Sequence, residues 1–224
     1  MRPVVVFFSF IIVSTILMSF QQKNNSLEYL PLGDSYTICT GAEENDSWPL
    51  LLTRHLNENK ISTKLLVNPA RNGYSTQDLI NYELPLLKKL NPGFVTILIG
   101  VNDWVRGVPA PVFKKNLVYI LDEVQKSVPG KKNIILISIP DFGVTPQGKS
   151  YGGGRNISAG ISEFNAIIRT EAKNRGLALV DIFGVSKQME KDVTLVAADG
   201  LHPSAKEYAV WEKMILAESL KLLK

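Results

Sequence analysis

The sequence predicts an α/β protein in which helices cover a parallel sheet. Short apolar runs typical of strands alternate with longer stretches in which apolar residues recur every three or four positions. The chain has 224 residues, of which 45% are hydrophobic, so it is long enough to bury one full core. We therefore expect a single domain over residues 27–224, preceded by a segment of different character.

The predicted elements follow one another in alternation. The strand-like runs are residues 27–32, 64–68, 94–99, 133–139 and 177–181. The helical stretches are residues 47–59, 75–90, 111–127, 158–175 and 204–223. We expect Ser47 to cap its helix, because Trp48 and Pro49 follow it, and Pro85 to kink the helix that contains it. Residues 140–156 form the longest irregular segment, and loops of this size often border binding sites.

Residues 1–22 differ from the rest of the chain. Arg2 is followed by an uncharged apolar stretch that ends at Phe20, a pattern typical of a signal peptide. The cleavage pattern is poor, because Leu17 stands where a small residue is preferred, so an uncleaved membrane anchor is an alternative and a buried helix is a third. We expect an exported protein, periplasmic or secreted, or one that associates with a membrane through this segment.

The composition argues against one class of partner and against one kind of cross-link. The formal net charge is +4, but the basic residues are scattered and never exceed pairs, so nucleic-acid binding is not expected. Cys39 is the only cysteine, which excludes an intramolecular disulfide. We expect Cys39 to be a small buried hydrophobe rather than a nucleophile, and the protein to be a monomer.

Residues 143–150 match the spacing of a phosphate-binding P-loop. Such a loop requires a helix to begin at its Gly-Lys-Ser, so that free backbone N–H groups meet the phosphates. Here Ser150 is followed by a tyrosine and three glycines, which resist helix formation, and Pro146 removes one N–H from the would-be cradle. An exported protein would also meet little ATP. We therefore interpret the match as a coincidence.

Polar residues follow the predicted strands at the points where ligands bind in parallel sheets. They are Gly33-Asp34-Ser35, residues 68–73, residues 100–103 and, before the last helix, residues 199–203. Taken singly, each of these is also what a turn, a helix cap or a loop contains. Together they supply a hydroxyl, a glycine amide, a side-chain amide, a carboxylate and an imidazole, which are the groups that acyl transfer requires.

The chemistry of these groups suggests a role for each. A serine such as Ser35 becomes a nucleophile when a base takes its proton, and histidine is the side chain suited to this near neutral pH. The chain has two histidines, and His55 lies on a helix whose leucines face the core, which leaves His202 as the base. Asp199, three residues earlier, can reach the other ring nitrogen and fix its tautomer.

An oxyanion that forms next to Ser35 needs hydrogen-bond donors. The backbone N–H of Ser35 can point outward at the start of a helix, Gly73 permits close approach of the backbone, and Asn102 adds a side-chain N–H group. Trp104, Phe142 and Tyr151 offer an apolar wall for an acyl chain or a stacking face for a sugar, and packing is an equal alternative for each.

Four stretches of this sequence resemble the motif blocks of the GDSL, or SGNH, hydrolase family. They are "LPLGDSYT", "PARNGYSTQDL", "ILIGVNDW" and "ADGLHPSAKEYAVW", in the family's order and spacing. The resemblance implies a three-layer α/β/α, flavodoxin-like fold with a parallel five-stranded sheet, and ester hydrolysis without cofactor or metal. It assigns Ser35, Gly73, Asn102 and His202 as nucleophile, two oxyanion donors and base, with Asp199 orienting the histidine. The similarity is greatest to the lysophospholipase-like branch of small bacterial members.

The function expected from these observations is a serine hydrolase that cleaves carboxylic esters through an acyl-enzyme intermediate. Its partner is a small-molecule ester: an acyl ester, a lysophospholipid or an acylated sugar. Transfer to an alcohol instead of water is a variant, and a binding module that retains the fold without activity is an alternative from another class. Asp34 and Asp103 are interpreted as structural. Cys39 departs from the family, whose members commonly have a small residue such as glycine there.

Overall fold

A parallel sheet of five strands runs through the centre of the computed structural model, which describes residues 26–128 and 130–224. The strand order is β2-β1-β3-β4-β5, and every neighbouring pair is parallel. The strands are β1 (Leu27–Gly33), β2 (Thr63–Leu65), β3 (Phe94–Leu98), β4 (Ile134–Ile137) and β5 (Ala178–Val180). The predicted fold class is confirmed, and each predicted run contains or overlaps a strand.

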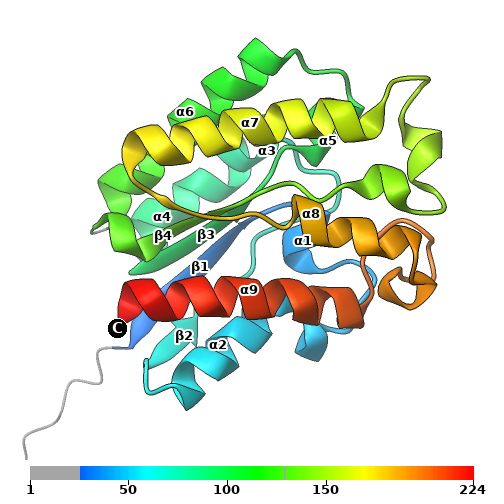
Figure 1. Ribbon diagram of the computed structural model, residues 1–224. Helices are drawn as coiled ribbons and strands as arrows, with labels where there is room; N and C mark the ends of the chain where they lie inside the picture. Colours follow the sequence, from blue (N-terminus) through cyan, green and yellow to red (C-terminus); the bar gives the residue numbers. More distant parts are fainter. Residues whose placement is uncertain (1–25, 129) are drawn as a thin grey trace, which may run out of the picture.

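Helices cover both faces of this sheet and make three layers (Figure 1). Helices α2 (Trp48–Glu58) and α9 (Ala205–Leu223) lie on one face, and α6 (Ala110–Ser127) and α7 (Ile157–Arg175) lie on the other. Because both faces are covered, the central strands are apolar throughout, and all five residues of β3 are buried. The remaining helices are α1 (Ser35–Ile38), α3 (Thr76–Asp78), α4 (Leu84–Leu90), α5 (Val101–Val105) and α8 (Phe183–Ser186).

Residues 76–90 form one continuous helical run, as the sequence predicts, but the turn before Pro85 is π-helical. The chain runs from α3 through a π-helical segment, Leu79–Glu83, into α4. Pro85 lies in the first turn of α4, where its missing N–H costs nothing. The helix before it widens, and the N–H of Leu84 donates to the carbonyl of Leu79, five residues back. The widened turn thus accommodates Pro85 within one helical run.

Two smaller expectations are also corrected. Ser47 occupies the N-cap position of α2, but its side chain makes no capping hydrogen bond and instead lines a surface hollow. Strand β2 has three residues and not five, because the chain turns away from the sheet edge. Asn68 marks this turn, since its side-chain N–H donates to the carbonyl of Thr37 at 2.8 Å.

The P-loop spacing does not form a P-loop. Residues Gly148–Tyr151 make a short 3₁₀ turn, and the next long helix, α7, begins only at Ile157. The N–H of Gly148 donates to the carbonyl of Thr145 at 3.1 Å, so it is not free to bind a phosphate. The backbone here therefore lacks the geometry that a P-loop requires.

The predicted signal peptide or membrane anchor over residues 1–22 lies outside the described residues. Within residues 26–128 and 130–224, no helix is long and apolar enough to cross a bilayer.

Glu207, on the buried face of α9, makes the stability of the fold dependent on pH. The side chain is fully buried, and one carboxyl oxygen accepts a hydrogen bond from the indole of Trp211 at 2.7 Å. Burial raises the pKa of Glu207 from 4.5 to about 7, although the Trp211 hydrogen bond opposes the shift. Between these two values the folded protein keeps a proton that the unfolded chain releases, so the free energy of unfolding falls as pH rises.

We expect Glu207→Gln to remove this contribution, because glutamine accepts the Trp211 hydrogen bond and does not ionise. The fall in unfolding free energy between about pH 5 and pH 8 should then be smaller by about 2 to 3 kcal/mol than in the wild type. Urea denaturation at the two pH values measures it, with Glu163→Gln, an exposed residue on α7, as control. Equal pH dependence in Glu207→Gln and the wild type would contradict the assignment.

Candidate active site

A cavity of about 90 Å³ opens at the carboxyl edge of the sheet. It lies where the strand order reverses: after β1 the chain adds β2 on one side of it and then β3 on its other side. The residues that line it come from distant parts of the chain: Ser35, Tyr36, Val101, Asn102, Val105, Phe142, Tyr151, Leu201 and His202. Five of these were predicted as site residues from the sequence: Ser35, Asn102, Phe142, Tyr151 and His202.

Ser35 is the first residue of α1, directly after β1. Asp34 caps this short helix, because one of its carboxyl oxygens accepts a hydrogen bond from the N–H of Tyr36 at 3.0 Å. Glu83, from the π-helical segment, accepts a hydrogen bond from the N–H of Gly33 at 2.9 Å. The turn that presents Ser35 is thus held from both sides by buried carboxyl groups.

His202 and Asp199 form a hydrogen-bonded pair on the loop before α9. The Nδ1 atom of His202 lies 2.6 Å from Oδ2 of Asp199. The other oxygen of Asp199 accepts the backbone N–H groups of Leu201 and His202, each at 2.9 Å. Partial burial raises the pKa of Asp199, but these hydrogen bonds outweigh it and hold the pKa below its ordinary value. Asp199 is therefore ionised at neutral pH and can stabilise a charged imidazole.

The ring of His202 is oriented by its surroundings. Its edge faces the ring of Tyr36, with the centroids 5.9 Å apart. The N–H of Ala197 donates to the carbonyl of His202 at 2.8 Å, which closes the loop. Gly41 lets the loop pack closely, since a Cβ there would lie 2.6 Å from the Cβ of Ala197. Both Ser35 and His202 line the cavity, and within the described chain no hydrogen bond joins them.

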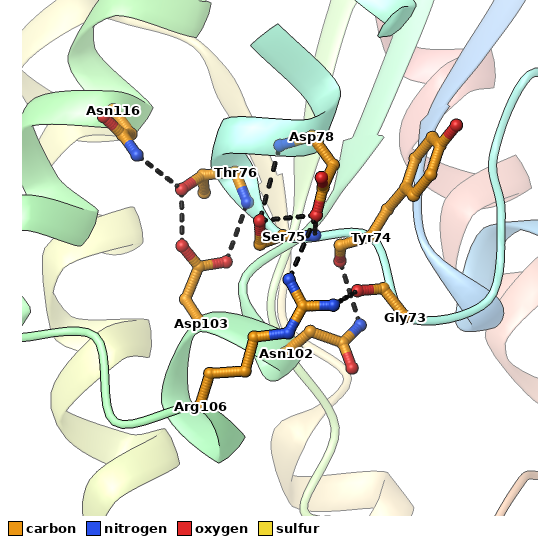
Figure 2. A network of polar contacts seen from close by, with 9 residues as sticks. All are labelled: Gly73, Tyr74, Ser75, Thr76, Asp78, Asn102, Asp103, Arg106 and Asn116. Atoms are coloured by element: carbon orange, nitrogen blue, oxygen red, sulfur yellow. Dashed lines mark hydrogen bonds and ion pairs between the residues drawn. The ribbon is translucent and has the colours of Figure 1, made fainter. Parts of the chain in front are cut away.

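Asn102 lies on α5, directly after β3, and faces the same cavity. Its side-chain nitrogen donates one hydrogen bond to the carbonyl of Tyr74 at 2.9 Å, as Figure 2 shows. An amide group has two N–H donors, so the second remains for a ligand. Gly73, which precedes Tyr74, is not among the residues that line the cavity but is linked to it through this bond.

The backbone at Gly73 has the geometry of a tight turn. The N–H of Tyr74 donates to the carbonyl of Arg71 at 3.2 Å, and Gly73 has a φ of 81° at the third position of the turn. A type II turn requires glycine at this position. No hydrogen bond from the N–H of Gly73 is found within residues 26–128 and 130–224, so this donor is available.

Asp103 holds the segment after Gly73 in place. Its carboxylate accepts hydrogen bonds from the backbone N–H of Thr76 at 2.8 Å and from the Thr76 hydroxyl at 2.5 Å. Asp34 is fully buried, and burial is the main cause that raises its pKa to about 8. Both residues hold backbone turns and do not line the cavity, which agrees with the structural role expected for them.

The three aromatic residues predicted to bind substrate separate into two groups. Phe142 and Tyr151 line the cavity, and Tyr151 is 46% exposed. Trp104 lies outside that lining, because its indole packs beneath Arg155, whose guanidinium carbon is 4.1 Å from the ring centroid. Its edge-to-face contact with Phe142, 6.0 Å between centroids, makes it a support for the cavity wall rather than part of it.

Four lining residues were missed by sequence reasoning. Tyr36 directly follows the candidate nucleophile, and Leu201 directly precedes the candidate base. Val101 and Val105 are four residues apart and therefore lie on one face of α5, beside Asn102. Proximity in sequence to the predicted site residues is the signal that could have identified all four.

A family model matches most of this chain. The model describes the GDSL-like lipase/acylhydrolase family, and it covers residues 32–210. The chain belongs to this family. Membership of the GDSL-like family assigns it to the carboxylic ester hydrolases. The particular similarity to a lysophospholipase-like branch stays a prediction.

Relatives of this GDSL-like chain include several esterases. A multidomain esterase from Ruminococcus flavefaciens is 29% identical over 131 residues, which is 57% of this chain but only 15% of that protein's length. Three solved structures share the fold. A psychrotrophic esterase from Pseudoalteromonas sp., solved with monoethylphosphonate as inhibitor, is 21% identical, and the match covers 87% of this chain and 97% of that one with a TM-score of 0.66. A lipase/acylhydrolase from Enterococcus faecalis is 21% identical (coverage 85% and 94%, TM-score 0.69), and an acetylxylan esterase from Geobacillus stearothermophilus is 20% identical (coverage 86% and 93%, TM-score 0.67).

Cys39 is the residue at which this GDSL-like chain departs from the pattern expected of the family. It ends α1 with a φ of 63°, a left-handed conformation that glycine adopts without strain. Its side chain is 1% exposed, and its sulfur accepts a hydrogen bond from the N–H of Trp48 at 3.3 Å. Burial raises the pKa of the thiol far above its ordinary value. The expectation of a small buried hydrophobe is confirmed.

Proposed function

We propose that this protein is a serine hydrolase that cleaves carboxylic esters, with Ser35 as nucleophile, His202 as base and Asp199 as the residue that orients the base. The convergence of Ser35, Asn102 and His202 on one cavity carries the proposal. The 2.6 Å contact between Asp199 and Nδ1 of His202 supports it further, because it leaves Nε2 as the nitrogen that exchanges protons.

In the proposed reaction, Nε2 of His202 takes the proton of Ser35 as the serine oxygen bonds to the ester carbonyl carbon. The carbonyl electron pair moves to its oxygen, and the resulting oxyanion accepts hydrogen bonds from the N–H groups of Ser35 and Gly73 and from the Asn102 side chain. The intermediate then expels the alcohol, which receives the proton from His202. Water attacks the acyl-Ser35 ester in the same way and releases the acid.

We expect Asn102→Ala to lower kcat by roughly 10²- to 10³-fold, because one oxyanion donor is lost. KM should change little, since the charge on the oxygen develops only in the transition state. Steady-state kinetics on a soluble aryl ester measures both constants. Asn81→Ala, an exposed asparagine on the π-helical segment, serves as the control and should retain wild-type kcat. An equal loss in the two variants would argue against the oxyanion role.

The size of the cavity suggests a short acyl group. At about 90 Å³ it is smaller than the engineered cavities of about 150 Å³ that hold benzene. Its walls include the apolar side chains of Val101, Val105 and Phe142, which suit a hydrocarbon group of a few carbons. We therefore propose acetyl to butyryl esters as the preferred substrates, with the alcohol part lying toward solvent and exposed Tyr151.

A panel of aryl esters with acyl chains from acetyl to decanoyl tests this proposal. We expect kcat/KM to be highest for the short acyl chains and at least about tenfold lower for decanoyl. A chain too long for the cavity can be buried only if the side chains that line the cavity move. Acetylated sugars and lysophospholipid should be assayed beside them. A preference for decanoyl or for lysophospholipid would contradict the short-chain proposal while leaving the hydrolase intact. Added alcohols would reveal acyl transfer as a second product.

Covalent labelling identifies the nucleophile independently of any substrate. A fluorophosphonate should add one phosphonyl group to Ser35, since such reagents react with a serine activated by a histidine, and one relative was solved with a phosphonate inhibitor. Peptide mass spectrometry locates the adduct. Labelling at another residue, or no labelling of active enzyme, would exclude Ser35 as the nucleophile. Export, or membrane attachment through residues 1–22, remains part of the proposal and is tested by fractionating cells.

A further inference from the structure

Arg106 connects the helix of one proposed oxyanion donor with the loop of the other. It caps the C-terminus of α5, the helix that carries Asn102. Its guanidinium donates to the carbonyl of Gly73 at 2.6 Å through Nη2 and to Oδ2 of Asp78 at 3.1 Å through Nη1 (Figure 2). One planar side chain therefore binds both ends of the segment from Gly73 to Asp78.

Helix α5 holds this segment at three points, all visible in Figure 2. Arg106 binds the carbonyl of Gly73, Asn102 binds the carbonyl of Tyr74, and Asp103 accepts two hydrogen bonds from Thr76. The contacts from Asn102 and Asp103 fall on residues after Gly73. Among the described residues, only the contact from Arg106 reaches Gly73 itself.

Gly73 needs such a contact more than its neighbours do. A glycine has no Cβ, so steric clashes do little to fix its backbone dihedral angles. A Cβ at this position would lie 3.6 Å from Nη2 of Arg106, which is ordinary contact, so the φ of 81° and not lack of space accounts for the glycine. The Gly73 carbonyl shares a peptide plane with the Tyr74 N–H, and this plane is held on one side by the turn hydrogen bond to Arg71 and on the other by Arg106. The two backbone dihedral angles of Gly73 link the direction of its own N–H to that plane, so fixing the plane limits where the N–H can point.

We propose that Arg106 is a positioning residue of the oxyanion site: by holding the carbonyl of Gly73 against α5, it keeps the N–H of Gly73 directed at the developing oxyanion. This inference rests on the proposed function. Asp78 has a supporting part, because its carboxylate holds the second nitrogen of the guanidinium and also accepts the N–H and hydroxyl of Ser75 at 2.9 and 2.7 Å.

The positioning role of Arg106 can be distinguished from a general contribution of this side chain to folding stability. The side chain of Arg106 is 53% exposed, and ion pairs at exposed positions contribute little to folding. A lysine has one compact ammonium group and cannot reproduce two parallel contacts in fixed directions. Loss of Arg106 should therefore affect kcat far more than folding, and lysine should not restore it fully.

The test compares Arg106→Ala and Arg106→Lys with Arg169→Ala. Arg169 is a matched control, because it is also 53% exposed and forms an ion pair with an aspartate, Asp181, at 2.9 Å. We expect kcat on a short aryl ester to fall by roughly 30- to 100-fold in Arg106→Ala and less in Arg106→Lys, with KM within about threefold, since a misdirected donor weakens only the transition state. Arg169→Ala should match the wild type.

Thermal unfolding and steady-state kinetics together decide between a positioning role and a folding role for Arg106. Thermal unfolding should give Arg106→Lys and Arg169→Ala the same midpoint, within error, as the wild type. If Arg106→Lys and Arg106→Ala keep wild-type kcat, or if the loss appears in KM alone, the positioning role is wrong. A wild-type protein without esterase activity would instead refute the proposed function itself. Partial loss in a normally folded Arg106→Lys supports the role even where Arg106→Ala fails to fold.

Discussion

Ser35→Ala is expected to lower kcat/KM for a soluble aryl ester by a factor on the order of 10⁴ to 10⁶, because it removes the proposed nucleophile. His202→Ala should cause a loss of the same order. The double variant should be no worse than either single one, since nucleophile and base act as a unit. The measurement requires enzyme free of contaminating esterases, which a mock purification checks.

Ser150→Ala provides the control for this experiment. Ser150 is exposed on the 140–156 loop that borders the cavity. Its hydroxyl donates to the carbonyl of Gln147 and to no other group of the described residues, so its loss should leave turnover unchanged. If Ser35→Ala kept more than about a tenth of wild-type turnover, the nucleophile assignment would fail. A wild-type protein that binds esters and never turns them over would instead favour the binding module.

Asp199→Asn is expected to lower kcat by roughly 10³ to 10⁴, the second largest effect. Asparagine keeps the oxygen that accepts the N–H groups of Leu201 and His202, so the loop should retain its shape. Its amide group, however, presents N–H toward Nδ1 of His202 in place of an acceptor. The ring must then carry its proton on Nε2, the nitrogen that has to accept the proton of Ser35.

Asp192→Asn is the matched control for this substitution. Asp192 precedes the same loop, and its side chain is 42% exposed, as is that of Asp199. Among the described residues its carboxylate forms hydrogen bonds with Lys206 and Thr194 and none with His202, so activity should stay near the wild type. A similar loss in both variants would indicate damage to the loop rather than a wrong histidine tautomer.

The order and type of the main elements could be predicted because they depend on local pattern. Strands such as β3 are buried on both faces and therefore read as continuous apolar runs, and α6, α7 and α9 show helical spacing. The helical run over residues 76–90 could be predicted, but its π-helical turn could not, because the effect of Pro85 depends on which carbonyl the widened turn can reach. The side chain of Ser47 likewise follows its tertiary surroundings and not its position before the helix.

The candidate site was predictable to the extent that each residue directly follows a strand or precedes a helix. Ser35, Asn102 and His202 satisfy this condition, and the sheet brings them together whatever the intervening loops do. Arg106 does not satisfy it. Its contact with Gly73 joins residues 33 positions apart, and no local pattern marks such a pairing. Trp104 was misleading because its neighbours are site residues, whereas its own side chain points into the packing between α5 and α7.

The buried thiol of Cys39 has a practical consequence for studying this protein. Its sulfur lies between the end of α1 and the start of α2, four residues after Ser35, and a thiol reagent can reach it only when these elements separate. As the chain contains no other cysteine, every labelling event reports that one separation. The rate of labelling in the native protein therefore reports how often the structure beneath the proposed nucleophile opens, without the need to introduce a cysteine by mutation.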